Sequence, residues 1–281
     1  MTDSVYEISH LTLVPRRHIG RIVGAVAVVG ILASIVYSFA VGQIEWSYVA
    51  EFLTVPVILR GLGNTIVMAV CAMLLGLALG VVFAVMRLSD NPVLKHTAVA
   101  YVWFFRAVPA LLQLLLWFNL ALIFPTIGFP GLFSVRTVDV MTPFVAALLG
   151  LGIQQGAFTA EVVRAGLQAV DKGQYEAAQS IGMPRLQMLR RIIMPQAMRV
   201  IVPPVGNEFI GMVKLTSLAS VIQFTEILHS AQNIYYANSR VIELLIVAAS
   251  WYLVVVTALS LIQIRIEKFY AKGVRPVGGE A

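Results

Sequence analysis

Eight polar side chains lie in or beside two long apolar stretches of this sequence, 142–163 and 200–222. Amide, hydroxyl and charged groups are costly at membrane depth, so they usually face a bundle interior or a water-filled path. The residues are Gln154, Gln155, Glu161, Arg164, Asn207, Glu208, Lys214 and Thr216. We predict that they line a path for a polar solute. The alternative for Glu208 and Lys214 is a structural ion pair with a neighbouring helix.

Patterns that would indicate catalysis are missing from the sequence. It contains no GxxxxGK[ST] phosphate loop, no HExxH and no GxSxG, so nothing indicates ATP binding by this chain, a metalloprotease site or a serine hydrolase. The four histidines are far apart along the chain, which gives no support for a metal site. The sequence therefore favours a conduit over a catalyst.

A short polar segment between two apolar stretches has the pattern of two helices joined by a sharp turn. Residues 172–180 contain good helix formers, Gly182 suits the left-handed position just after a helix, and Pro184 suits the first turn of the next helix. Pro195 then ends or kinks the second helix. We predict two short helices at the membrane surface.

This segment has the features of a docking site for another protein. Ala177 and Ala178 leave a low-profile face that a partner can approach closely, and Glu176 adds one charge for register. We expect the unit to be held by a partner protein.

The elements that must position these residues are membrane helices. Of the 281 residues, 59% are hydrophobic and 12% are charged, whereas about a quarter are charged in soluble domains. Six stretches have the roughly 20 apolar residues that a helix needs to cross the bilayer. They are 19–41, 61–86, 97–123, 142–163, 200–222 and 241–264. The sequence predicts an all-α polytopic membrane protein with six transmembrane helices, the first retained rather than cleaved as a signal peptide.

The basic residues predict the orientation. Most of the 20 Lys and Arg residues precede the first stretch, follow the last one, or lie between the second and third and between the fourth and fifth. Basic residues are retained on the cytoplasmic side. Both termini and the connection 164–199 are therefore predicted to be cytoplasmic. Because this placement accounts for the net charge of +6, we expect membrane lipid, and no nucleic acid, as a partner.

Two glycine pairs, each one helical turn apart, predict close helix packing, since small residues let helix backbones approach in lipid. They are Gly76 with Gly80 and Gly152 with Gly156. Packing within one bundle and contact between subunits are both compatible with this spacing.

Arg106 interrupts the stretch 97–123, which is longer than a single span needs. We expect it in an interfacial helix, with its guanidinium extending toward water. Pro109 is a point at which the stretch can bend.

The polar segment also resembles a known family motif. Glu176, Ala177, Ala178, Gly182, Ile192 and Pro195 match the EAA loop of ABC-importer permeases, E-A-A-x3-G-x9-I-x-L-P, with Met194 in place of the usual leucine. The stretches WFFRAVPALLQ, GAFTAEVVRAG and PQAMRVIVPPVGNEFIGMVKLTSL resemble the polar amino acid subfamily. The resemblance covers roughly 60–270.

The resemblance implies a type I ABC importer permease bundle with a cytoplasmic coupling helix in the bacterial inner membrane. It implies a second permease subunit, identical or related, two ATPase subunits that bind ATP and Mg²⁺, and an extracytoplasmic amino-acid-binding protein. No cofactor is then expected in this chain. The implied domains are a cytoplasmic segment 1–18, an additional helix 19–41, a permease domain 60–270 with its coupling loop 171–195, and a tail 271–281.

A secondary transporter driven by protons or sodium, with Glu208 or Glu161 as the relay, is the main alternative. Such carriers usually show paired inverted repeats or broken helices in both halves, and neither is visible in the sequence. They also have no need of a docking loop. A membrane enzyme is a third class, for which no nucleophile or metal cluster is found.

Overall fold

The computed structural model describes residues 19–129 and 133–271, which form two units, one up to Glu45 and one from Trp46 onward. The first unit consists of helix α1 (Ile19–Val41), whose bounds agree with the predicted first span. Its apolar side chains are exposed along the described helix, as expected for a helix surrounded by lipid. The predicted terminal segments 1–18 and 271–281 lie outside the described residues, except for Ala271.

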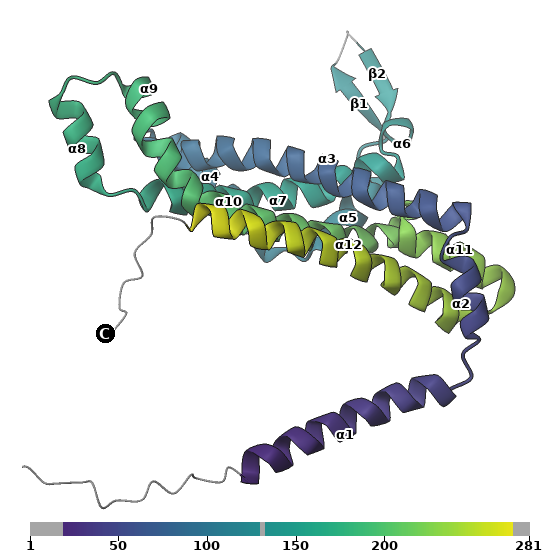
Figure 1. Cartoon of the computed structure of the whole chain (residues 1–281). Coiled ribbons are helices and arrows are strands. Elements are labelled where there is room, and N and C mark those ends of the chain that lie inside the picture. Colours follow the sequence, from purple (N-terminus) through teal and green to yellow (C-terminus); the bar gives the residue numbers. More distant parts are fainter. Residues whose placement is uncertain (1–18, 130–132, 272–281) are drawn as a thin grey trace, which may run out of the picture. The chain divides into compact units, whose positions relative to one another are not determined.

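The second unit is a helical bundle with one small hairpin (Figure 1). Its elements are α2 (Trp46–Phe52), α3 (Pro56–Arg87), α4 (Pro92–Ala107), α5 (Ala110–Phe118), η1 (Leu120–Leu122), β1 (Thr126–Phe129), β2 (Phe133–Arg136), α6 (Thr137–Val140), α7 (Pro143–Gln168), α8 (Lys172–Ser180), α9 (Arg185–Met188), η2 (Leu189–Ile193), α10 (Met194–Leu215), η3 (Thr216–Ile222), α11 (Ile227–Asn238) and α12 (Val241–Tyr270).

Local sequence explains where the long helices begin. α3, α4 and α7 each start with a proline, which suits the first turn because its missing N–H has no helical partner there. The side chain of Asn91 accepts the N–H of Val93, and that of Thr142 accepts the N–H of Val145. These caps satisfy donors that a helix start leaves unpaired.

The glycine pairs pack α3 against α7 within one chain, which resolves the alternative left open by their spacing. A Cβ atom at Gly80 would lie 2.6 Å from Cβ of Thr159, and one at Gly156 would lie 2.8 Å from Cβ of Leu79. Only residues without a side chain allow these two backbones to come so close. The α3–α7 contact is therefore a close helix crossing next to the polar residues of α7.

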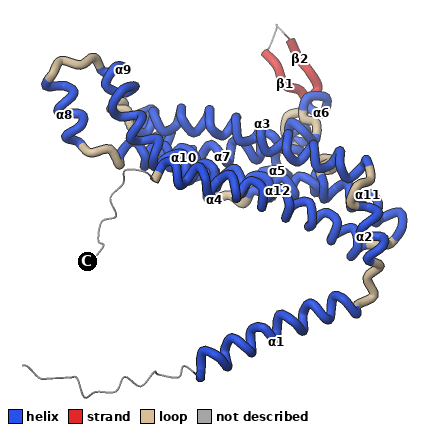
Figure 2. Tube along the Cα trace, viewed as in Figure 1, coloured by secondary structure: helices blue, strands red, loops and turns tan. Residues whose placement is uncertain are grey.

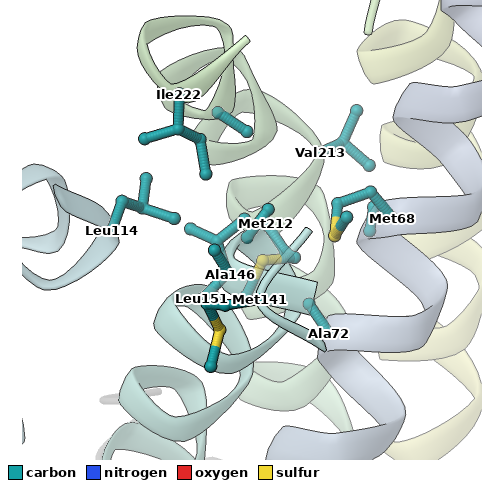
Figure 3. Packing of buried hydrophobic residues seen from close by; sticks show 12 residues of the cluster. Met68, Ala72, Leu114, Met141, Ala146, Leu151, Met212, Val213 and Ile222 are labelled. Atoms are coloured by element: carbon teal, nitrogen blue, oxygen red, sulfur yellow. The ribbon is translucent and has the colours of Figure 1, made fainter. Parts of the chain in front are cut away.

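The core between these helices is apolar and closely packed. Figure 3 shows side chains from α3, α5, α7, α10 and η3 meeting at its centre. The labelled residues are Met68, Ala72, Leu114, Met141, Ala146, Leu151, Met212, Val213 and Ile222. Each is at most 7% exposed, so this core fixes the positions of α7 and α10 relative to each other.

The predicted span 97–123 is instead two helices, α4 and α5, which meet at an angle of 101° at Val108 and Pro109. Pro109 has no N–H to continue α4, and the residue before a proline avoids the helical conformation. Five described helices are long and apolar enough to cross a membrane, and the bent pair makes six if it counts as one span. The predicted all-α fold is confirmed, and so are its six spans if the bent pair counts as one span.

Two further features were not predicted. β1 and β2 form an antiparallel hairpin with Thr126 opposite Arg136 (Figure 2), in the connection between the predicted spans 97–123 and 142–163. The predicted span 200–222 changes from α-helix to 3₁₀-helix at Thr216.

α3 begins at Pro56, so the predicted domain boundary at residue 60 falls inside a helix.

Candidate functional site

The predicted docking segment forms a separate unit at one end of the bundle, where α8 and α9 project beyond the other helices (Figure 1). We call residues 171–195 the coupling unit. α8 has the predicted bounds, and Asp171 caps it by accepting the N–H of Gly173. Gly182 has φ of 70°, the left-handed conformation that glycine adopts at little steric cost. The sharp turn between the two helices is therefore as predicted.

The second helix differs from the prediction because Pro195 does not end it. α9 passes through the π-helical segment η2 into α10, and Pro195 lies in the first turn of α10. In η2 the N–H of Met194 donates to the carbonyl of Leu189, five residues earlier. A π segment accommodates local disruption of helical hydrogen bonding without ending the helix. The coupling unit is thus continuous with the membrane helix that carries Glu208.

The motif residues divide into an inward and an outward set. Ala178 is 1% exposed and Ile192 is partly buried, and both pack among residues of α7, α9 and α10. Glu176, Ala177, Gly182 and Pro195 are exposed. The low-profile face predicted for Ala177 and Ala178 is therefore available at Ala177 only, because Ala178 packs against its own chain.

Tyr175 ties α8 to the membrane helices. Its hydroxyl donates to the carbonyl of Leu167 at 3.3 Å, and burial raises the pKa of the Tyr175 phenol, which keeps the donor protonated. Gln196 in α10 also donates to Gln174 in α8, at 3.2 Å. α8 is therefore attached to both α7 and α10.

Within the membrane bundle, Glu208 of α10 meets two polar residues of α7. Nε2 of Gln155 donates to its carboxylate at 2.7 Å, and the hydroxyl of Thr159 donates at 3.1 Å. Gln155 also donates to the Thr159 hydroxyl at 3.1 Å. Neutral donors thus satisfy Glu208, and the alternative of a structural ion pair between Glu208 and a neighbouring helix is not found among the described residues.

A second polar cluster surrounds Glu161 on α7. Its carboxylate pairs with Arg87, with Arg164 at 2.7 Å, and with Arg106 at 3.9 Å. The Arg106 guanidinium also lies over the ring of Phe158. Arg87, Arg106, Phe158 and Glu161 border a hollow of about 420 Å³ together with Trp103, whereas Arg164 does not line it. Three guanidinium groups around one carboxylate leave the cluster with a net positive charge.

The other predicted path residues do not join these clusters. Asn207 donates to Glu267 of α12 at 3.0 Å, and Thr216 is buried and donates to the carbonyl of Val213. Gln154 donates to the carbonyl of Val108 at the bend between α4 and α5. Lys214 is exposed and makes no ion pair with any described residue, so the expectation that it faces the bundle interior is wrong for this single subunit.

Sequence reasoning missed three members of the two clusters. Arg87 was read only as an orientation signal, and Arg106 was expected to extend toward water, although it contacts Glu161. Thr159 was not singled out, although it lies four residues after Gln155 and therefore on the same helix face. That spacing was the available signal.

Comparison with known proteins gives the family. Residues 76–272 match the model of the binding-protein-dependent transport system inner membrane component. The chain is 38% identical to the arginine transport system permease protein ArgU of Corynebacterium glutamicum, over 92% of this chain and 83% of ArgU. It is 35% identical to the L-cystine transport system permease protein TcyB of Bacillus subtilis, over 80% and 91% of the two chains.

A solved structure agrees with this relationship. The structure described as an amino acid ABC transporter with histidines superposes with a TM-score of 0.70 and 32% identity, covering 81% of this chain and 100% of that chain. The continuous coupling unit, the α3–α7 crossing and the polar clusters thus occur in a fold shared with a transporter. The chain belongs to the family of binding-protein-dependent transport system inner membrane components.

Proposed function

We propose that this chain is the permease subunit of an ATP-driven importer that carries a polar amino acid across the bacterial inner membrane. The observation that carries the proposal is the contact of Glu208 with Gln155 and Thr159, which places hydrogen-bonding groups between two membrane helices. The relatives named for arginine and L-cystine transport support an amino acid as the solute.

The two clusters suit a zwitterionic solute that passes first one cluster and then the other. Glu208 lies 14 residues after Met194 at the start of α10, or roughly 20 Å along the helix, and so deep in the bundle. The guanidinium of Arg106 lies 3.9 Å from the carboxylate of Glu161, and Glu161 follows Thr159, a partner of Glu208, along α7. A solute that moves toward the cytoplasmic end therefore meets carboxylates, which accept its ammonium group, and guanidinium groups, which bind its carboxylate.

The coupling unit would connect this path to ATP hydrolysis. In the proposed complex, a second permease subunit, identical or related, completes the path, and each of two ATPase subunits receives one coupling unit. The ATPases bind ATP and Mg²⁺, and a binding protein outside the cytoplasm delivers the amino acid. Closure of the ATPases would move α8, and its attachments to α7 and α10 would pass the movement to the helices that carry Glu208 and Glu161.

The test is purification of the membrane complex, identification of its subunits, and uptake by proteoliposomes that contain it. We expect uptake of a polar amino acid that requires ATP and the binding protein and that persists with an uncoupler. Uptake driven by a proton or sodium gradient without ATP would instead identify a secondary transporter.

The proposed topology predicts the labelling of cysteines from one side. In a Cys71→Ser background, Gln179→Cys in α8 is expected to react with an impermeant maleimide only from the cytoplasmic side, because α8 projects from that end of the bundle. Phe133→Cys in the hairpin serves as the matched site, expected to react only from the outside. Reaction of Gln179→Cys from outside would invert the topology and contradict the assignment of both termini to the cytoplasm.

Replacing Glu176 by alanine is expected to reduce transport and substrate-stimulated ATP hydrolysis together. Glu176 is exposed in α8, where such a change alters folding stability by less than about 0.5 kcal/mol and alanine favours the helix. Loss of one charge-assisted hydrogen bond to the ATPase costs about 1.5–3 kcal/mol, which weakens docking roughly 10- to 100-fold. The measurements are both activities in reconstituted complex.

The matched control for Glu176 is Gln179→Ala, also exposed on α8 and uncharged. It should retain both activities. Full coupling in the Glu176→Ala variant would remove the assigned role, and loss of that variant from the membrane would instead point to a structural one.

A further inference from the structure

The hairpin of β1 and β2 has one apolar face and one face of polar and small residues. Residues directly opposite each other in an antiparallel pair lie on the same face of the sheet, and successive residues of a strand alternate between the faces. The apolar face consists of two cross-strand pairs, Ile127 with Val135 and Phe129 with Phe133. The other face consists of two further pairs, Thr126 with Arg136 and Gly128 with Ser134.

The described part of the chain leaves most of the apolar face uncovered. Phe129 is 66% exposed, Phe133 57% and Val135 43%. The two phenyl rings pack edge to face across the hairpin, with centroids 5.9 Å apart. The apolar run just before β1 is exposed as well, and it consists of Leu122, Ile123 and Phe124. Exposed apolar surface of this kind marks a contact with protein or with a membrane.

The base of the hairpin is fixed to the bundle. Thr137 is buried, its N–H donates to the carbonyl of Pro125 at 3.0 Å, and its hydroxyl donates to the carbonyl of Phe124. Arg136 donates through two nitrogens to Asp139 of α6, at 2.8 and 2.9 Å. The hairpin therefore has a fixed direction, and the one charged side chain of its two strands is neutralised by an ion pair.

The register between α3 and α7 gives the level at which the hairpin leaves the bundle. A Cβ atom at Gly76 would touch Gln155, and one at Gly80 would touch Thr159, so the two helices run in the same direction. α7 begins 12 residues before Gln155. Its start therefore lies level with the residue 12 positions before Gly76, which is Asn64 of α3.

This level is at the outer border of the membrane. Roughly 20 helical residues cross the hydrocarbon core, and counting that many back from Arg87, the charged last residue of α3, reaches Val67. α3 continues outward past Asn64 to Pro56, roughly 12 Å further. Figure 1 shows β1 and β2 at the side of α3, short of the end where α2 lies. The hairpin thus leaves the bundle sideways, at the depth of the lipid headgroups.

We propose that the hairpin lies in the outer interface of the bilayer, with its apolar face on the acyl chains of phospholipids and its polar face in water. The interface has apolar surroundings on one side and water on the other, which matches the two faces of the hairpin. The strands stay at this depth because their outer edges carry unpaired N–H and C=O groups, which are not tolerated in hydrocarbon. The hairpin is a lateral anchor that sets the depth of α5 and α7.

A soluble protein and a second copy of the chain are the other partners that an apolar patch fits. A soluble protein approaches from beyond the outer ends of the helices, whereas the hairpin leaves the bundle roughly 12 Å short of the end of α3. Lipid is favoured because it surrounds the bundle at this depth, so that it covers both the apolar face and the exposed run before β1. The other two partners are opposing outcomes of the test.

The test is spin labelling of single cysteines in the Cys71→Ser background, with the full chain in vesicles of phosphatidylcholine. Labels at Phe133→Cys and Val135→Cys should lie about 5–10 Å inside the headgroup boundary, where they collide often with oxygen and rarely with a water-soluble nickel chelate. Ser134→Cys, between them on the polar face, is the matched control and should show the opposite pattern. Phe133→Cys should also react with maleimide more slowly than Ser134→Cys.

Two outcomes overturn the inference. Nickel collisions as frequent at Phe133→Cys as at Ser134→Cys would place the apolar face in water, free for a soluble partner. Shielding of Phe133→Cys and Val135→Cys from both reagents would show a protein contact, and spectral broadening that disappears on dilution with unlabelled chain would identify a second copy. The contrast between neighbouring residues is the same on either side of the membrane, so it tests the anchor independently of the proposed topology and transport activity.

A charged substitution on each face provides a second measurement. Phe129→Asp should move a label at Val135→Cys into water and raise its nickel collisions to the level of Ser134→Cys. Thr126→Asp, in the same strand but on the polar face, should leave that label in lipid. Because Asp139 neutralises Arg136, phosphatidylglycerol in the vesicles should not change either result. Contact that forms only with phosphatidylglycerol would show electrostatic binding and would overturn the assignment of an apolar anchor.

Discussion

Replacing Gly80 by leucine is expected to destabilise the chain by about 3 kcal/mol, the upper end of the range for overpacked cores, and to abolish transport. A Cβ atom at this position would lie 2.6 Å from Cβ of Thr159 and 3.1 Å from the backbone nitrogen of Ala160. The backbone of α7 would therefore have to move away from α3. Because Thr159 donates to Glu208, the same movement breaks the polar contact between α7 and α10.

The measurement is thermal unfolding of the purified chain in detergent, where we expect a melting temperature lower by roughly 10 °C. Gly63→Leu in the same helix is the control, since a Cβ at Gly63 meets no atom within 4 Å. It should unfold close to the wild-type temperature. Equal melting temperatures for the two variants would show that the α3–α7 crossing yields easily and does not hold the site in place.

The sequence predicted those parts of the fold that depend on neighbouring residues along the chain. α1 and α8 have the predicted bounds, because apolar runs and helix formers act within each element. The turn at Gly182 was predicted because φ above zero is cheap only for glycine. These local signals were enough to place the coupling unit.

Features that depend on tertiary packing were predicted less well. Pro109 indicated a bend, but the 101° angle between α4 and α5 is set by the surfaces on which those helices pack. Pro195 was expected to end or kink a helix, yet α9 continues through a π segment into α10. The hairpin of β1 and β2 consists of two four-residue strands that are mostly exposed, and segments so short gave too weak a strand signal to be recognised from the sequence.

The candidate site shows the same division. Gln155, Glu161 and Glu208 each contact other polar groups, while their role in lining a path stays a prediction. Their partners come from separate elements, since Arg87 is the last residue of α3 and Arg106 lies in the last turn of α4. The composition of one helix holds no information about which charge of another helix will reach it, so the cluster around Glu161 could be recognised only in three dimensions.

Replacing Glu161 by glutamine is expected to lower stability and transport together, because it removes the carboxylate shared by three guanidinium groups. Side chains of Arg87 and Arg164 are 24% and 27% exposed, and that of Glu161 is 21% exposed. Breaking a fully buried pair costs about 3–5 kcal/mol; partial access of water reduces this to about 1–3 kcal/mol here. We expect melting roughly 5 °C lower and uptake reduced at least about tenfold.

Asp139→Asn is the matched control for this change. It removes the carboxylate of an exposed pair with Arg136, whose side chains are 73% and 51% exposed, and such surface pairs contribute little. The melting temperature of Asp139→Asn should stay within about 1 °C of the wild type. If the melting temperature of Glu161→Gln also stayed near that of the wild type, the charge cluster would not contribute to holding α3, α4 and α7 together.

A second substitution separates repulsion among the arginines from loss of packing. Arg87→Gln removes one of the cations that Glu161→Gln leaves uncompensated, so the double variant should be more stable than the sum of the two single effects predicts. Packing loss alone would make the two effects additive, because glutamine has nearly the volume of glutamate. Recovery of stability without recovery of uptake would then assign the carboxylate of Glu161 a role in the path itself, since a neutral pair can hold the helices but cannot bind the ammonium group of an amino acid.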